Sequence, residues 1–206
     1  MKIIIMAAGS GKRWEGERPK HLTEFDGEPL LLRTLRLLHE KEQSDVYVTV
    51  SDALMEHLVP GTFEPYGSIF YKPHGNVQEI DRFLSCREIW GEETLFLYGD
   101  VYYTAEAIVQ ILGQYIRPIS FYGRRRGNDV KRYGEMFALR ANTNDPKFEK
   151  ILLAIREREI KGEARGLGWD VYRAYEKRNF VELDPRVEDF DKVEEVGIYK
   201  KIHNLR

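Results

Sequence analysis

The chain alternates short runs of apolar residues with longer stretches in which apolar positions recur every three or four residues. The first pattern is typical of buried strands and the second of amphipathic helices. The apolar runs predict strands over residues 3–7, 46–50, 69–71, 94–98, 119–122, 136–139 and 180–183. The second pattern predicts helices over residues 29–41, 77–90, 105–115, 148–161 and 169–178, and a last helix from about residue 187.

The order of these elements indicates an α/β fold. Strands that alternate with helices form a mostly parallel sheet with helices on both faces. Residues 3–7 are apolar at every position, as expected of a central strand that is covered on both sides. We therefore predict one three-layer α/β/α domain over residues 1–206, with a mostly parallel, mixed sheet. Residues 123–134 are expected to form its most mobile loop.

Composition narrows the class of protein. The 206 residues carry a formal net charge of -2, which argues against a nucleic-acid partner. Cys86 is the single cysteine, so an intrachain disulfide cannot form and a reducing compartment is favoured. The apolar run at 3–8 is too short for a membrane span or a signal segment. We expect a cytoplasmic protein without a membrane partner.

The loop after the first predicted strand combines glycine with positive charge. It has the sequence AAGSGKR at residues 7–13. Glycines allow a tight turn whose exposed amides can surround an anion. Lys12, Arg13 and, after Pro19, Lys20 add three cations, which suits the charge of a triphosphate. The alternative is an ordinary glycine-rich surface turn with solvated charges.

Two well-known glycine motifs do not fit this loop. A P-loop requires Gly-x-x-x-x-Gly-Lys-Ser/Thr, but Met6 stands at its first glycine and Arg13 at its hydroxyl position. The dinucleotide motif Gly-x-Gly-x-x-Gly would need glycine where Trp14 stands. The sequence therefore favours neither a P-loop kinase nor a nicotinamide-dependent dehydrogenase.

The loop and the Pro19-Lys20 pair resemble the signature Ala-Ala-Gly-x-Gly-x-Arg … Pro-Lys of nucleotidyltransferases. This superfamily includes sugar-phosphate, phosphocholine, methylerythritol-phosphate and molybdenum-cofactor nucleotidylyltransferases. The resemblance implies the Rossmann-like nucleotide-diphospho-sugar transferase fold. It continues over residues 22–35 and extends to about residue 196.

Three later segments carry the same resemblance. Gly99-Asp100 follows a predicted strand, as does the family's Gly-Asp that holds magnesium. Residues 133–138 are similar to the strand that borders the acceptor site. Residues 181–190 are similar to the family's closing Val-Asp-Ile-Asp-Thr-Pro-Glu-Asp-Leu, with Arg186 as one extra residue.

The resemblance implies a role for each site residue. Lys20 would stabilise the charge that develops on the α-phosphate, and Arg13, with Lys12, would offset the leaving pyrophosphate. Asp100 and Asp184 would hold Mg²⁺, since both follow predicted strands and magnesium prefers oxygen ligands. The nucleotide itself would be bound by residues Ala7, Ala8, Gly9, Ser10, Gly11, Lys12, Gly75 and Asn76.

Several of these residues also have purely structural interpretations. Asp100 could cap a helix, Asp184 could begin a turn, and Gly75-Asn76 could be a plain surface turn. Asp189 and Asp191 are expected in the first turn of the last helix, where they would favour the helix dipole. The Arg124–Arg126 run is expected to be solvated, the alternative being a grip on an acidic acceptor. His21, His74 and Cys86 are expected to be structural.

The sequence thus predicts a magnesium-dependent nucleotidyltransferase. It would move a nucleoside monophosphate from a nucleoside triphosphate, with CTP slightly preferred, to a phosphorylated small acceptor and release pyrophosphate. A homodimer is compatible with the family. One alternative is a module that binds nucleotide without turnover. Another is a nucleotide-sugar glycosyltransferase, which would normally show an Asp-x-Asp metal motif after a strand.

Overall fold

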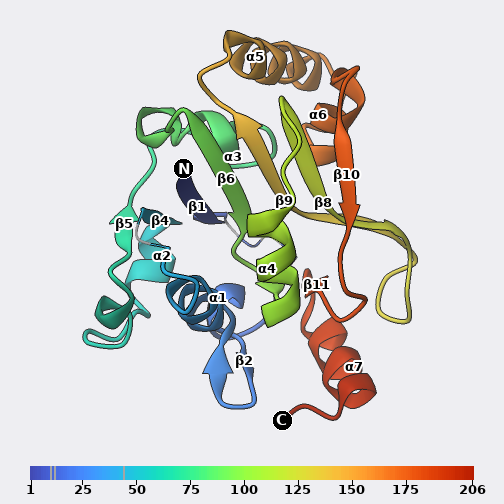
Figure 1. Cartoon of the computed structure of the whole chain (residues 1–206). Coiled ribbons are helices and arrows are strands. Elements are labelled where there is room, and N and C mark those ends of the chain that lie inside the picture. Colours follow the sequence, from blue (N-terminus) through green and yellow to red (C-terminus); the bar gives the residue numbers. More distant parts are fainter. Residues whose placement is uncertain (10, 12, 44) are drawn as a thin grey trace.

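The computed structural model describes residues 1–9, 11, 13–43 and 45–206. A seven-stranded sheet crosses the centre of the molecule in the order β10-β8-β9-β6-β1-β4-β5 (Figure 1). Its strands are β1 (Lys2–Ala7), β4 (Val46–Val50), β5 (Ile69–Tyr71), β6 (Glu93–Tyr98), β8 (Ile119–Arg126), β9 (Tyr133–Asn142) and β10 (Asn179–Glu182). The structure confirms the predicted mostly parallel, mixed sheet, because only β9 runs antiparallel to both of its neighbours.

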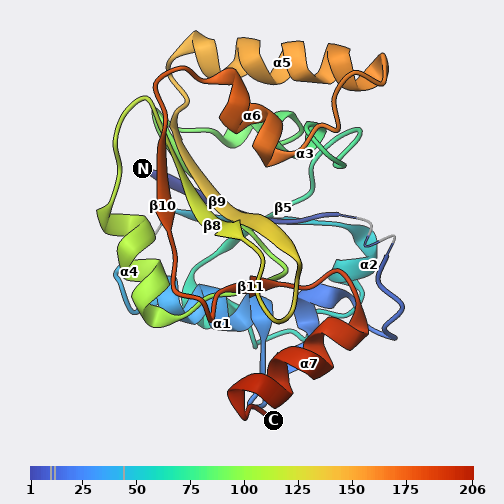
Figure 2. The ribbon, with the colours of Figure 1, turned by 90° about the vertical axis from the view of Figure 1, so that its right-hand side faces the viewer.

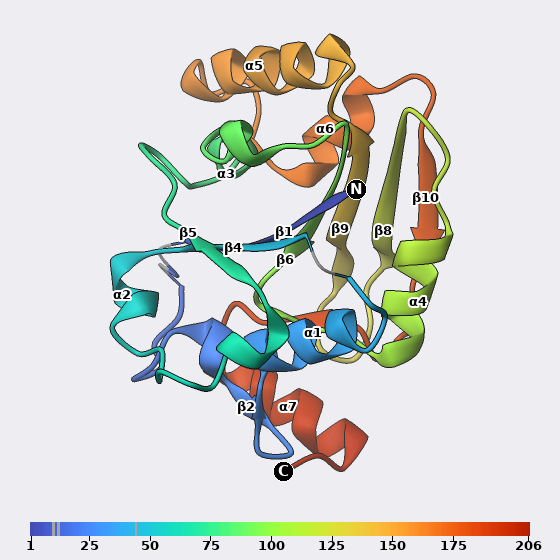
Figure 3. The ribbon, with the colours of Figure 1, turned by 60° about the vertical axis from the view of Figure 1, so that its left-hand side comes forward.

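Helices cover both faces of this sheet, which gives the predicted three layers. One layer consists of α3 (Asp81–Leu84), α5 (Pro146–Ile160) and α6 (Gly168–Ala174) (Figure 2). The opposite layer contains α1 (Leu30–His39) and α4 (Ala105–Gly113), while the short α2 (Asp52–Met55) follows β4 near the sheet edge at β5 (Figure 3). Apolar side chains fill the sheet on both faces and form two separate core clusters.

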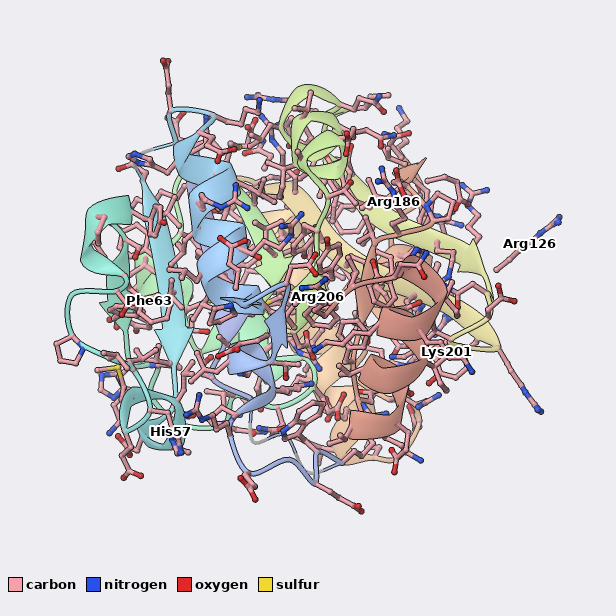
Figure 4. All side chains as sticks on the ribbon, turned by 90° about the horizontal axis from the view of Figure 1, so that it is seen from below. His57, Phe63, Arg126, Arg186, Lys201 and Arg206 are labelled. Atoms are coloured by element: carbon pink, nitrogen blue, oxygen red, sulfur yellow. The ribbon has the colours of Figure 1, made fainter. Side chains whose placement is uncertain are left out.

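A third, smaller core lies beyond the α1 layer. Here α7 (Val193–His203) packs beside two short ribbons, one of β2 (Glu24–Phe25) with β3 (Glu28–Pro29) and one of β7 (Val101–Tyr102) with β11 (Glu188–Asp189). Phe25 stacks on Phe190, and Tyr199 meets the edge of both rings. The C-terminus is also fixed here, since Asp26 exchanges two hydrogen bonds with Arg206, which Figure 4 labels.

Three predicted elements differ from the structure. The helix predicted over 77–90 is reduced to α3 and a single 3-10 turn (Arg87–Ile89), because Cys86 departs from helical geometry between them. The helix predicted from residue 187 begins only at Val193, and β11 precedes it. The predicted loop at 123–134 is mostly hairpin: β8 extends to Arg126 and β9 begins at Tyr133, so the arginine run is in a strand.

None of the helices in the described part of the chain is both long and apolar enough to cross a lipid bilayer.

Candidate active site

A cavity of about 800 Å³ opens at the carboxyl ends of β1 and β6. In parallel α/β sheets this edge is where ligands generally bind. The N-terminal loop, the end of β6, the start of β9 and the chain before α6 contribute to its wall. A second hollow of about 550 Å³ lies between α4 and β10. Its lining contains no lysine or arginine among the described residues, so it offers no cation to a phosphate.

The glycine loop forms one side of the cavity. Ala8, Gly9 and Gly11 line it, whereas Ala7 lies fully buried behind them and donates its amide to Thr49. Gly11 has a φ of 58°, a left-handed conformation that glycine adopts without strain. Its carbonyl accepts the amide of Trp14, which closes the turn. The predicted ligand residues Ser10 and Lys12 lie outside the described part of the chain.

Lys20 and Asp100 meet in the wall of the cavity as a hydrogen-bonded ion pair. Their side chains are 15% and 17% exposed, so most of the pair is removed from water. Burial alone would raise the pKa of Asp100, but the Lys20 ammonium outweighs it and the pKa falls to about 2. The structure therefore places a carboxylate and an ammonium in contact, in the same cavity wall as the glycine loop.

His21, which the sequence suggested is structural, also contributes to the cavity wall. It is 4% exposed, and burial lowers its pKa to about 4, so the ring is neutral near pH 7. Its Nδ1 atom is buried and has no hydrogen-bond partner among the described residues. No sequence motif marks this histidine, apart from its position next to Lys20.

Arg13 reaches the cavity from the exposed end of the loop. Its guanidinium forms an ion pair of 2.8 Å with Asp191, and its side chain remains 68% exposed. The carboxylate partner is only 9% exposed. Arg13 therefore has both the access and the charge to meet an anionic ligand at the cavity mouth.

Asp189 and Asp191 lie in the cavity wall, where the sequence led us to expect a helix. That expectation is wrong, because Asp189 belongs to β11 and pairs antiparallel with Val101 of β7. Phe190 donates its amide to the carbonyl of Asp100 over 3.3 Å, which holds the two chain segments together. The alternation of polar and apolar residues over 189–191 is too short to distinguish a strand from a turn, so no signal in the sequence alone indicates this position.

These carboxylates form an acidic cluster with Glu135. One oxygen from each of Glu135, Asp189 and Asp191 lies within 4.8 Å of the others. Burial raises the pKa of Asp189, and the nearby charges of Glu135 and Asp100 add to the effect. Asp189 Oδ1 is buried without a hydrogen-bond partner among the described residues. An all-carboxylate donor set with one unused oxygen is suited to Mg²⁺ or another hard divalent ion.

Asp184, the predicted second metal ligand, is directed elsewhere. Both of its carboxylate oxygens accept hydrogen bonds from Arg186, at 3.0 and 2.8 Å. This hydrogen bonding lowers the pKa of Asp184. It is not among the described residues that line the cavity, because a turn at 184–187 separates it from β11. The structure therefore brings Asp189 near Asp100 and places Asp191 in the same cavity wall, and does not bring Asp184 there.

The loop at Gly75-Asn76, predicted to contact the nucleotide base, contributes to the cavity only through residues that follow it. Gly75 and Asn76 are exposed and do not appear in the described lining, whereas Gln78 and Arg82 do. Asn76 donates to Asp81 and accepts the amide of Gln78, so it shapes the loop that presents Gln78 to the cavity.

The lining of the cavity also contains aromatic and polar residues. Tyr98, Tyr133 and Trp169 line it together with Arg165. Gly168 is buried behind Tyr98, and a Cβ at this position would meet the Tyr98 hydroxyl at 2.7 Å. Trp169 is held by stacking on Phe180 at 5.5 Å between ring centres. The lining therefore combines flat rings with hydrogen-bonding groups.

The chain resembles a known protein family. The sequence model of the MobA-like NTP transferase domain matches residues 3–131. A comparison with curated protein sequences finds no significant match.

Solved structures of similar fold cover almost the whole chain. A protein assigned as a glucose-1-phosphate thymidylyltransferase from Bacillus anthracis superposes with a TM-score of 0.66 at 15% identity, over 98% of this chain and 94% of that chain. CTP:phosphocholine cytidylyltransferase from Streptococcus pneumoniae gives 0.64 at 19%, over 98% of both chains. Inositol-1-phosphate CTP transferase from T. maritima gives 0.63 at 14%, over 98% and 94%.

Proposed function

Because the chain belongs to the MobA-like NTP transferase family, a group of nucleotidyltransferases, we propose that it transfers a nucleoside monophosphate to a phosphorylated small acceptor. Pyrophosphate is the second product. One observation carries this proposal: the Lys20–Asp100 ion pair lies in the same cavity wall as the glycine loop. Attack at the α-phosphate needs a cation at that phosphate, amides along the chain of phosphates, and carboxylates for a metal.

Each of these groups has a role that follows from its position in the cavity. Lys20 neutralises charge as it develops on the α-phosphate, because its ammonium is largely removed from water beside the carboxylate of Asp100. Arg13 offsets the charge of the departing pyrophosphate, because it is exposed at the mouth. The amides of the glycine loop bind and orient the nucleotide. Placing these groups in advance lowers the barrier without covalent chemistry by the protein.

We assign the divalent metal to Asp100 and Asp189. When bound, magnesium would align the reacting oxygens and spread their charge. Asp189 Oδ1 has no hydrogen-bond partner among the described residues and is free to act as a ligand. Asp184 stays a prediction that no contact in the cavity supports.

The acceptor is proposed to bind against Tyr133, Trp169 and Arg165 of the cavity lining. Arg165 is exposed and suits a phosphate, while the rings suit a sugar, polyol or choline group. The similar structures include enzymes named for glucose 1-phosphate, phosphocholine and inositol 1-phosphate. Two of these three are named for CTP, so CTP is our first donor to test. We place residues 1–206 in one catalytic domain that acts in the cytoplasm.

The experiment is a thermal-shift panel of the four nucleoside triphosphates, each with and without Mg²⁺. A selective, magnesium-dependent rise in Tm supports the nucleotide site and identifies the base. Pyrophosphate release is then screened against phosphorylated sugars, polyols and phosphocholine. No shift with any nucleotide at millimolar concentration, together with no pyrophosphate release, would contradict the proposal.

One observation favours a second candidate. Asp189, Phe190 and Asp191 form an Asp-x-Asp sequence that begins in a strand and lies in the cavity, which is the pattern expected of a nucleotide-sugar glycosyltransferase. Such an enzyme would cleave a nucleotide sugar and release a nucleoside diphosphate. Detection of that product from UDP-, GDP- or dTDP-sugars, without any pyrophosphate chemistry, would favour this candidate over nucleotidyl transfer.

A further inference from the structure

Lys131 is a buried cation that the proposed mechanism does not use. Its side chain is 1% exposed and extends from the β8–β9 turn toward the acidic cluster. The ammonium lies 2.8 Å from Asp189, 3.3 Å from Asp191 and 3.5 Å from Glu135. Glu195, at 4.0 Å, is a fourth carboxylate partner.

The same three carboxylates, Glu135, Asp189 and Asp191, are the ones whose oxygens converge closely enough to hold a metal ion. A divalent ion in their midst would stand next to the Lys131 ammonium, and like charges at such distances repel strongly in a buried site. The ammonium and a metal ion therefore compete for the centre of the cluster. Asp189 Oδ1 remains on another side, because the ammonium contacts Oδ2 and Oδ1 has no hydrogen-bond partner among the described residues.

The turn that carries Lys131 is fixed to the core. The side-chain oxygen of Asn128 accepts the amides of Val130 and Lys131, at 2.9 and 2.8 Å. Its side-chain nitrogen donates to Glu188 over 2.7 Å, and Glu188 is fully buried beside Arg124. The backbone of Lys131 is thus held against β11, the strand that carries Asp189.

We infer that Lys131 takes the place of a second divalent cation and confines the site to one metal ion, held between Asp100 and Asp189. The inference rests on the proposed function and deepens it. Lys131 acts through the carboxylates, so it is a positioning residue and not a catalytic one. Its removal should expose a second set of metal ligands at Glu135, Asp189 and Asp191.

The test counts bound Mn²⁺ per chain by equilibrium dialysis, with an excess of the α,β-methylene analogue of CTP on both sides. Wild type and Lys131→Arg should bind one ion. Lys131→Met should bind two, and Mn²⁺ should raise its Tm more than that of wild type. The matched control is Arg126→Met, which removes an exposed cation from the same hairpin and should leave the count at one. Figure 4 shows the Arg126 side chain extending away from the molecule.

Each outcome is informative. Two ions on wild type, or one ion on a folded Lys131→Met variant, overturns the inference and leaves the proposed function intact. Absence of bound Mn²⁺ from every variant overturns both. If Lys131→Met fails to fold, the number of Mn²⁺ ions bound by wild type and by the smaller, polar Lys131→Gln variant tests the inference instead.

Discussion

Asp100 and Asp189 are neighbouring carboxylates in different electrostatic surroundings. Asp100 has Lys20 as a direct partner, and its pKa falls to about 2. The pKa of Asp189 is raised instead, by burial and by the charges of Glu135 and Asp100, even though the Lys131 ammonium opposes this rise. The negative charge on Asp189 is therefore less fully compensated, and a divalent cation placed between the two residues would stabilise it most.

Exchanging single carboxylates for amides separates the two candidate metal ligands. We expect Asp189→Asn to reduce turnover by about 10²- to 10³-fold, the usual cost of losing one preorganised electrostatic contact. Asp184→Asn should retain near wild-type turnover, because this residue is bonded to Arg186 and is directed away from the cavity. The measurement is pyrophosphate release at saturating nucleotide and Mg²⁺. A greater loss in Asp184→Asn would restore the original assignment from the sequence.

Cys86 provides a residue-level test of the core. It is fully buried, and burial raises the pKa of its thiol to about 12. Because the thiolate is the reactive form, iodoacetamide at pH 8 should label the native protein far more slowly than the protein in denaturing urea. Mass spectrometry of the alkylated chain measures both rates. Equal rates would show that the sheet face over Cys86 is open to solvent.

The element that organises the site is the short strand β11, held by a buried ion pair. Arg124 donates to both carboxylate oxygens of Glu188, at 3.0 and 3.2 Å. Glu188 is fully buried, and the Arg124 side chain is 11% exposed. The neighbouring Arg125–Glu182 pair spans 3.6 Å between side chains that are more than half exposed. The two arginines are adjacent in sequence but differ strongly in burial.

We expect Arg124→Leu to lower the free energy of unfolding by about 3–5 kcal/mol, because it leaves the charge of Glu188 buried and uncompensated. Arg125→Leu should cost less than about 1 kcal/mol, since solvent screens its pair. Urea denaturation followed by circular dichroism measures both values. A similar small loss in the two variants would mean that Arg124 does not anchor β11.

Most strands could be predicted from the sequence, whereas β11 could not. Continuous apolar runs such as residues 3–7 and 94–98 need no partner to be recognised. By contrast, β11 contributes two residues and depends on pairing with β7 and on Phe190 in the third core. In the site, Lys20, Asp100 and the described residues of the glycine loop line one cavity, and the glycine pattern and the Gly-Asp pair after a strand are recognisable in the sequence. The positions of Asp189, Asp191 and Lys131 could not be predicted. The turn before β11 and the β8–β9 hairpin bring these residues to the acidic cluster, and the sequence does not specify the geometry of either.

At the scale of the whole molecule, segments that are far apart in the sequence pair and pack with one another. Strand β9 runs antiparallel between β8 and β6 and joins the C-terminal strands to the N-terminal half of the sheet. The C-terminal helix α7 packs on Phe25, which comes from the N-terminal part of the sequence. Tyr199 of α7 contacts the Phe25 ring and is 1% exposed. This arrangement supports the proposal that residues 1–206 form one domain.

One domain should unfold as a unit. Trp14, Trp90 and Trp169 lie in different regions, so their fluorescence samples the site loop and the α5–α6 layer together. We expect fluorescence and far-ultraviolet circular dichroism to give coincident urea transitions with a single midpoint. Two separate midpoints would indicate that the third core, with α7, unfolds independently of the sheet.

The central claim concerns which phosphorus atom is attacked, and a doubly labelled nucleotide tests it directly. The enzyme is incubated with Mg²⁺, the selected nucleoside triphosphate labelled at the α- and γ-phosphates, and the phosphorylated acceptors. We predict that the α-label enters the acceptor product while the γ-label leaves in pyrophosphate, in equal amounts. Asp100→Asn should slow both by about 10²- to 10³-fold. Transfer of the γ-label to an acceptor or to inorganic phosphate, with the α-label left in the diphosphate, would contradict the account.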